Sequence, residues 1–153
     1  MKTMIAALLA LLAMLPGQVL AQDAAVSAPI AQFIEAFNKG DVAAARSTHL
    51  TDALIVDEVA PYMWRGFDAW LADLGKDSAA QGLTDQSVEL GTPTRALVTG
   101  DNAYVIVPVT YRFKQKGTAM SEVAQMTFAL RRTSSGWKIA SWTWTGPNAT
   151  PAK

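Results

Sequence analysis

The chain has 153 residues, of which 50% are hydrophobic and 17% charged, with 13 Lys and Arg, 13 Asp and Glu, one His and no Cys. This length supports one domain, the ordinary charged fraction excludes a disordered or polyionic chain, and the balanced charge argues against nucleic-acid binding. One His and no Cys exclude zinc-finger, iron–sulfur and multi-histidine metal sites, and we expect no cofactor.

Residues 1–21 have the layout of a secretory signal peptide. Lys2 precedes an apolar run over residues 4–15, and small residues up to Ala21 offer a cleavage site. The run is too short for a spanning helix, which needs about 20 apolar residues. We therefore expect cleavage after Ala21, export to the periplasm or the medium, no membrane span in the mature chain, and a short linker over residues 22–27.

Two helices are predicted next. Ser27 can cap the first helix, with Pro29 in its first turn. Gly40 is placed to end it, and Asp41 to cap a short second helix that ends near residues 49–50. The large apolar residues of the first helix follow the spacing of one buried stripe: Ile30, Phe33, Ile34 and Phe37.

A short strand and a third helix follow. Residues 53–59 favour a strand, and residues 61–66 form a bend. Apolar residues repeat at helical spacing from Phe67 until Gly75, which is expected to end the helix. The small and polar residues 76–85 predict a loop.

From Gln86 onward the hydrophobic pattern changes to a period of two, which is typical of strands. Turn residues at 100–102, 116–117 and 134–136 separate the expected strands. Pro108 cannot donate a ladder hydrogen bond, so we expect a bulge or a sheet edge there. The residues expected to share one face of the sheet are Val105, Val107, Val109, Tyr111, Phe113, Ala124, Met126, Phe128 and Leu130.

Helices followed by hairpins predict an α+β domain over residues 28–146, with the helices on one face of a curved antiparallel sheet and a disordered tail over residues 147–153. Trp137 and Trp142 in the last strand differ by an odd number of positions, which would place them on opposite faces. Such a strand needs both faces covered, and we expect a homodimer through the sheet. The alternative is that part of the helical segment covers the second face.

Three segments carry a family resemblance: residues 30–41 with Phe-x-x-Ala-Phe-Asn-Lys-Gly-Asp, residues 52–57 followed by Trp64-Arg65-Gly66, and Gly136-Trp137-Lys138-Ile139. In this order they resemble the nuclear transport factor 2-like superfamily, and within it the SnoaL-like and ketosteroid isomerase-like branch. The resemblance covers residues 28–146. It implies a cone of helices and bent sheet around an apolar pocket, with pairs of chains packed sheet to sheet.

The resemblance places Asp57 where the isomerase has its proton-transferring Asp. A carboxylate in an apolar cone can accept and return a proton near neutral pH, because its charged form is disfavoured. The alternative for Asp57 is a strand-end carboxylate that hydrogen-bonds the neighbouring loop. Phe33 replaces the isomerase's Tyr donor, and residues 125–128 contain no acid for its second donor. Glu58 is expected to point to the opposite side and to be solvated.

His49 is the second candidate catalytic residue, as a general base oriented by a nearby carboxylate, or else a packing residue. Scytalone dehydratase-like chemistry uses paired histidines, which one His cannot supply. The candidate ligand-binding residues are aromatic, and each can instead belong to the core or to a dimer contact: Phe33, Tyr62, Trp64, Tyr111 and Trp142.

These observations favour an exported SnoaL-like domain protein with an apolar pocket for a small hydrophobic ligand and an incomplete catalytic set. One alternative is an isomerase, dehydratase or cyclase that uses Asp57 as general acid and base. A second alternative is a protein-interaction module that uses the face of the sheet.

Overall fold

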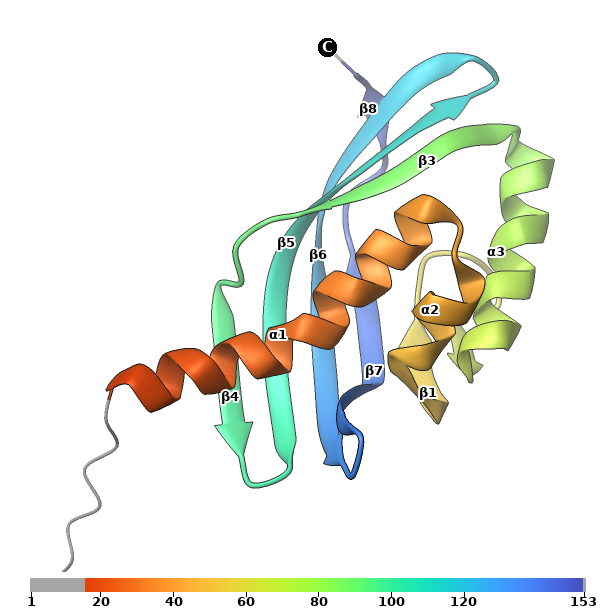
Figure 1. The fold of residues 1–153 in the computed structure, drawn as a ribbon. Coiled ribbons are helices and arrows are strands. Elements are labelled where there is room, and N and C mark those ends of the chain that lie inside the picture. The colour runs from red at the N-terminus through yellow and green to blue at the C-terminus, as the bar shows by residue number, and fades with distance from the viewer. Residues whose placement is uncertain (1–15, 153) are drawn as a thin grey trace, which may run out of the picture.

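The computed structural model describes residues 16–152, in which three helices cover one face of a curved eight-stranded sheet (Figure 1). The helices are α1 (Pro16–Lys39), α2 (Val42–Ser47) and α3 (Phe67–Gln81). The strands are β1 (His49–Val56), β2 (Met63–Arg65), β3 (Leu83–Leu90), β4 (Arg95–Thr99), β5 (Asn102–Gln115), β6 (Thr118–Thr133), β7 (Gly136–Thr145) and β8 (Thr150–Pro151).

The predicted signal peptide lies largely outside the described residues, and it stays a prediction. Its cleavage site after Ala21 falls within α1. Among the helices of residues 16–152, none is long and apolar enough to span a membrane.

The sheet is mixed rather than wholly antiparallel. Its strands lie in the order β2-β1-β7-β6-β5-β3, with β4 beside β5 and β8 beside β6. All neighbouring strands are antiparallel except β1 and β7, which run parallel. Short turns force antiparallel pairing only on strands that follow each other closely, and β1 is distant from β7 in the sequence. The predicted cone of helices on a curved sheet is confirmed, and its purely antiparallel pairing is wrong.

The first helix starts earlier than predicted. It begins at Pro16 rather than at Ser27, and Pro29 lies inside it. Proline lacks an N–H group, so one helical hydrogen bond is missing at this point. Packing of the apolar stripe against the sheet compensates for this loss. The buried residues of the stripe are Val26, Ile30, Phe33 and Ile34.

The end of the first helix and the start of the second are as predicted. Gly40 follows α1 with φ 68°, a conformation that favours glycine. The side chain of Asp41 accepts a hydrogen bond from the N–H of Ala44 and caps α2. The next strand, β1, then begins at His49, earlier than the predicted start at residue 53.

The predicted loop over residues 76–85 is wrong, because α3 continues through Gly75 to Gln81 and β3 begins at Leu83. The helix ends instead at Gly82, whose φ is 67°. Most of its last turns are exposed, so polar residues are tolerated there and hide the helix from a hydrophobic pattern.

The predicted local edge at Pro108 is confirmed. The carbonyl of Pro108 accepts a hydrogen bond from the N–H of Gly91 at 2.8 Å. This contact falls in the break between β3, which ends at Leu90, and β4, which begins at Arg95. In an antiparallel strand the nitrogen and carbonyl of one residue point to the same side. The missing N–H of proline is therefore at a place where no ladder partner requires it.

A bulge in β7 explains its aromatic pattern. Ala129 pairs with Ser141 and Leu130 with Ile139, which leaves Ala140 as an extra residue. The extra residue brings Trp142 to the same face as Trp137, and both are buried. The argument that this strand carries aromatic residues on both faces is therefore wrong. The homodimer that we inferred from it stays a prediction.

The end of the chain is ordered through β8. Thr150 pairs with Ser121, and Pro151 with Met120. The main chain of Gly146 packs on Glu122 and Ala124, where an added Cβ would clash. The expected disordered tail over residues 147–153 thus differs from the structure, since its central residues extend the sheet beside β6.

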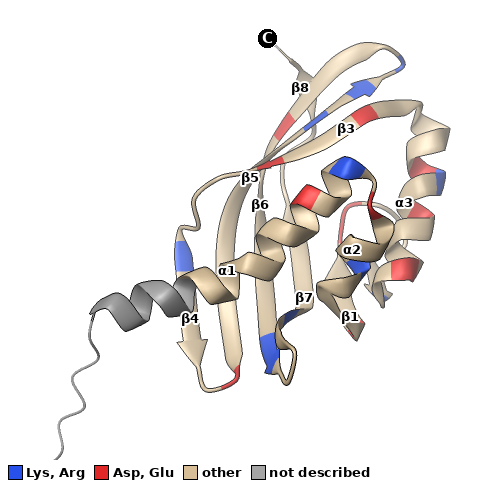
Figure 2. Cartoon of the chain, viewed as in Figure 1, with Lys and Arg blue, Asp and Glu red and all other residues tan. Residues whose placement is uncertain are grey.

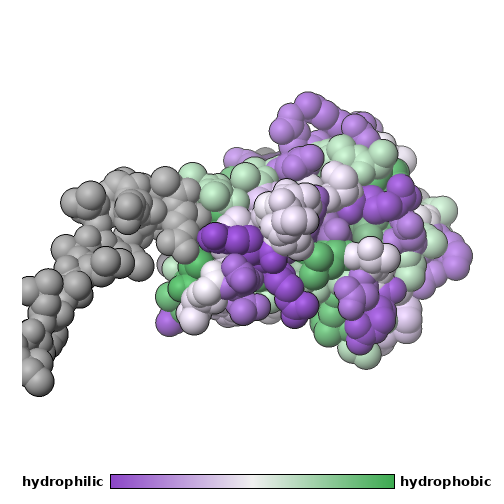
Figure 3. Space-filling model, turned by 60° about the horizontal axis from the view of Figure 1, so that its bottom comes forward, coloured by the Kyte–Doolittle hydropathy of each residue, from purple (hydrophilic) through white to green (hydrophobic). Residues whose placement is uncertain are grey.

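The outer surface mixes polar and apolar residues. Figure 2 shows Lys and Arg spread over several helices and strands rather than in one patch. The face in Figure 3 likewise alternates hydrophobic and hydrophilic groups. The large hydrophobic residues that are exposed among those described are Val42, Tyr62, Met63, Leu97, Tyr104 and Val123.

Deletion of Ala140 tests the bulge. Because Ala140 is the extra residue, its removal leaves regular alternation from Ile139 to Trp142, and Trp142 keeps its buried face. The variant should therefore unfold cooperatively and keep the wild-type tryptophan emission. The control is deletion of Thr143 in the regular part of β7, where a one-residue shift reverses the face of Trp144 and should red-shift the emission and lower the melting temperature. A red-shifted emission and lost cooperativity after deletion of Ala140 would contradict the assignment of the bulge.

Candidate functional site

A cavity of about 440 Å³ lies between α1, α3 and the inner face of the sheet. Its volume falls in the range of about 300–1,000 Å³ that small-molecule sites occupy. The loop after β1 and the segment before β8 also contribute to its wall. The aromatic residues that line it are Phe33, Phe37, Trp70, Tyr111, Phe113, Trp142 and Trp144.

Two of the predicted ligand-binding residues do not line the cavity. Tyr62 lies in the turn before β2 and is 60% exposed. Trp64, at the edge of the sheet, is buried against α3, where its indole N–H donates to Asp73 at 3.0 Å. The bend that holds both residues folds back on β1 rather than over the cavity. The remaining ligand-binding predictions lie on its wall: Phe33, Tyr111 and Trp142.

Asp57 follows the end of β1 and lines the cavity. Its Oδ2 accepts a hydrogen bond from the indole N–H of Trp70 at 2.7 Å, and its Oδ1 accepts one from the N–H of Glu58. Burial raises the pKa of Asp57, and the two hydrogen bonds partly oppose this effect. The raised pKa of Asp57 suits a proton-transfer group, and its hydrogen bond to the following loop suits the structural role that we gave as the alternative.

Glu58 also lines the cavity, so the prediction that it points away is wrong. The alternation of faces ends with β1 at Val56 and does not apply to residue 58. Glu58 is exposed, as predicted, and its carboxyl lies close to that of Glu122. Burial and the charges of Glu122 and Asp57 raise the pKa of Glu58 to about 7. Ionisation of one glutamate therefore disfavours ionisation of the other.

Glu122 is the buried member of this pair, with 3% of its surface exposed. Its Oε1 accepts a hydrogen bond from the indole N–H of Trp144 at 2.9 Å, and burial raises the pKa of its carboxyl. Sequence reasoning missed it, although a signal was present. Glu122 has the same strand parity as the buried Ala124 and Met126, which places a charged side chain on the apolar face of β6.

Tyr111 adds a neutral donor to the wall. Its hydroxyl donates to Gln86, and burial raises the pKa of Tyr111 far above its ordinary value. Its ring stacks on Phe113 and meets Trp144 edge-on, with ring centroids 4.6 and 6.0 Å apart. Trp70 and Trp142 also meet edge-on, at 5.0 Å. Such contacts fix the rings, so the cavity is shaped in advance of any ligand.

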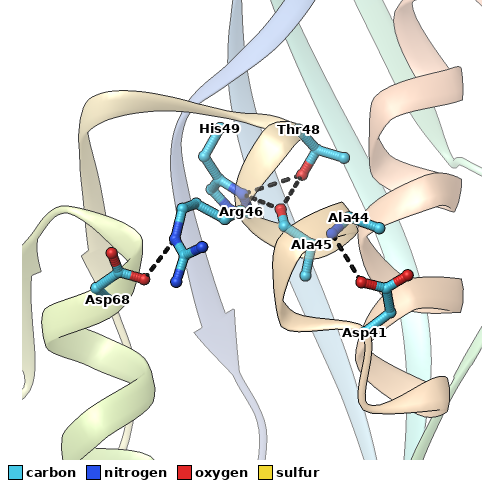
Figure 4. Close-up of polar contacts among 7 residues, drawn as sticks. All are labelled: Asp41, Ala44, Ala45, Arg46, Thr48, His49 and Asp68. Carbon is cyan, nitrogen blue, oxygen red and sulfur yellow. Dashed lines mark hydrogen bonds and ion pairs between the residues drawn. The ribbon is translucent and has the colours of Figure 1, made fainter.

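His49 lies outside the cavity wall, and Figure 4 shows its Nδ1 beside Ala45 and Thr48. Its Nδ1 is 3.0 Å from the carbonyl of Ala45, and its Nε2 accepts from the indole N–H of Trp142 at 3.1 Å. The ring packs edge-on against Phe33. Burial lowers the pKa of His49 to about 4, so the imidazole stays neutral. This environment supports the packing role rather than the catalytic one.

The arrangement suits binding and proton transfer rather than metal coordination by the described residues. Within residues 16–152 no group of three or more His, Cys, Asp and Glu residues is placed to hold a metal ion. The cavity instead combines rigid aromatic walls with carboxyl groups whose pKa values are raised. A bound molecule could therefore be held by apolar contacts and could exchange a proton with Asp57.

The comparisons with known proteins agree with this geometry. A family model described as a SnoaL-like domain matches residues 26–144. No curated protein sequence matches the chain significantly. The predicted resemblance is confirmed at the level of family and fold.

Solved structures show the same fold. A hexachlorocyclohexane dehydrochlorinase from Novosphingobium barchaimii has a TM-score of 0.75 and 18% identity, over 88% of this chain and 92% of that one. A ketosteroid isomerase-like protein from Erwinia carotovora has a TM-score of 0.65 and 21% identity, over 83% and 97%. A nuclear transport factor 2-like protein from Salmonella enterica has a TM-score of 0.71 and 12% identity, over 88% and 96%.

His49→Gln tests the structural role of the imidazole. The folded pKa of His49 is about 4 and its unfolded value is 6.5, so the unfolded chain binds the proton more tightly. The contribution of the neutral ring is fully present above pH 6.5 and is lost as the pH falls toward 4. The wild-type advantage over His49→Gln in unfolding free energy should therefore shrink by about 3 kcal/mol across this window.

Urea unfolding at several pH values measures this difference, and the other titrating groups cancel because both proteins contain them. Gln can accept the hydrogen bond of Trp142 without titrating, which keeps the variant folded. Parallel pH profiles for the two proteins would contradict the assignment.

Proposed function

The chain belongs to the SnoaL-like domain family, and we propose that it is an exported protein whose cavity binds a small, largely apolar molecule. The single observation that carries the proposal is the cavity of about 440 Å³, closed by α1 and α3 and lined by fixed aromatic rings. Export is supported by the signal-like pattern of residues 1–21.

The affinity expected of such a site is modest unless polar groups contribute. At about 25 cal/mol per Å², covering about 200 Å² of apolar ligand surface contributes about 5 kcal/mol before the loss of ligand motion is subtracted. Tighter binding therefore needs contacts with the polar groups of the wall. These groups include Asp57, the glutamate pair and the hydroxyl of Tyr111.

A second candidate function is proton transfer by Asp57 on the bound molecule. It is supported by the place of Asp57 on the cavity wall and by its pKa, which burial raises above the ordinary value of a carboxyl. Phe33 offers no donor to a ligand oxygen, so the oxyanion stabilisation of the isomerase would have to come from another group. A protonated Glu58 would have the required hydrogen.

We also keep the homodimer as part of the proposal. Tyr104 on β5 and Val123 on β6 are exposed apolar residues, 39% and 70% accessible. Both side chains lie on the outer face of the sheet, six pairing positions apart, since Tyr104 pairs with Ala129 and Thr110 with Val123. A second copy of the chain, packed sheet to sheet, would cover them.

The binding proposal is tested by melting the protein with a panel of steroid, polyketide and terpenoid compounds. Some of them should raise the melting temperature, because a ligand that binds only the folded state stabilises it. Leu74→Trp fills the cavity from α3 and should weaken that binding by about tenfold or more.

The matched control is Leu71→Trp, a half-buried residue of the same helix that does not line this cavity. It should bind as the wild type does. A panel without any shift, or equal loss of binding in both variants, would count against the cavity as the binding site.

Proton transfer is tested with Asp57→Asn on any compound that the protein converts. The variant should lose about 10²–10⁴-fold in kcat, the usual contribution of general acid–base catalysis, while ligand affinity changes little. Asp52→Asn, at an exposed residue of β1, is the control and should keep full activity. Unchanged turnover by Asp57→Asn would remove this candidate.

A further inference from the structure

The cavity wall has an unusual charge balance. Four carboxylate side chains line it, from the loop after β1, from α3 and from β6. Among the described lining residues there is no Lys, Arg or His. The four carboxylates are those of Asp57, Glu58, Asp77 and Glu122.

These carboxylates have no cationic partner within residues 16–152. The ion pairs among the described residues join other side chains, chiefly on the outer surface. The donors that hold the buried carboxylates are neutral indole groups, those of Trp70 for Asp57 and of Trp144 for Glu122. Neutral donors orient a carboxylate but leave its charge in place.

Keeping such groups in the cavity has an energetic cost. A buried carboxylate without a counter-charge is unfavourable, and the fold nevertheless holds Glu122 at 3% exposure. Glu58 lies within reach of it, so like charges add to the cost. A positive charge beside both carboxylates would offset the cost of burying Glu122 and the repulsion between Glu122 and Glu58.

The aromatic rings beside the carboxylates favour the same kind of occupant. Trp144, Tyr111 and Trp70 all line the cavity, and the first two are within 6.0 Å of each other, centroid to centroid. Ring faces attract organic cations, and the attraction is stronger in a desolvated site. The apolar remainder of the wall, including Met126 and Val88, suits the body of the ligand.

We propose that the ligand of this cavity is an organic cation, with an aromatic or aliphatic body and one amine or quaternary ammonium group near Glu122 and Glu58. The inference rests on the proposed function, namely that the cavity binds a small molecule, and adds the charge of that molecule. A neutral ligand would leave the carboxylates uncompensated, and an anionic ligand would be repelled by them.

The test uses three probes that share one ring system and differ in charge: 2-(1-naphthyl)ethylamine, 2-(1-naphthyl)ethanol and 1-naphthylacetate. Calorimetric titration of the wild-type protein at about pH 8 keeps the amine protonated and the carboxylates largely ionised. The amine should bind about tenfold or more tightly than the alcohol, and the acetate most weakly.

The variants Glu122→Gln and Glu58→Gln should reduce the preference for the amine over the alcohol to about threefold or less. Gln can still accept the hydrogen bond of Trp144, so the wall keeps its shape. The control is Glu89→Gln, an exposed carboxylate of β3 outside the cavity, which should leave the preference unchanged.

The outcomes separate the two proposals. Equal or stronger binding of the alcohol or the acetate would overturn the cationic ligand while supporting a binding cavity. An amine preference that survives both glutamine variants would also overturn it. Failure of all three probes to bind would overturn both the charge assignment and the proposed function.

Discussion

The chemistry of the site in this protein depends on two carboxylates of the cavity wall, each held by a hydrogen bond from an indole N–H group. Trp70 donates to Asp57 from α3, and Trp144 donates to Glu122 from the neighbouring strand of the sheet. Each hydrogen bond fixes a carboxyl group at the wall of the cavity without neutralising it. The wall therefore carries fixed positions for negative charge inside an aromatic shell, and both the acidity of the groups and the class of ligand follow from this arrangement.

The fold positions these pairs through features remote from the cavity. The bulge at Ala140 places Trp142 and Trp144 on the inner face of the sheet. The pairing of β8 with β6 holds the preceding segment, which includes Gly146, against Glu122. His49 then anchors Trp142 by accepting its indole N–H. The single histidine thus acts on the site indirectly, by holding an aromatic wall residue in place.

Periodicity predicted most of the fold correctly. The hairpin strands, the turns between them and the C-terminal end of α1 are encoded locally, in alternation and in glycines such as Gly40. The parallel pairing of β1 with β7 and the polar end of α3 were not predictable in this way. Pairing between distant strands leaves no local pattern, and exposed helical turns show none of the apolar spacing.

The site was predictable in part. Asp57 and Phe33 were identified from the resemblance, and Tyr111 and Trp142 from their faces in the expected strands. Tyr62 and Trp64 were misplaced because the bend that contains them folds away. Glu122 could have been found as the charged member of an apolar strand face. Glu58 could not, because it lies beyond the last residue whose direction the strand fixes.

The most direct test of this account is a carbon-13 NMR titration of the side-chain carboxyl groups. Glu58 should titrate near pH 7, and the pKa values of Glu122 and Asp57 should be raised above their ordinary values. If all three carboxyls titrated near pH 4, as they do in solvated peptides, the cavity would not desolvate them and the account would be contradicted.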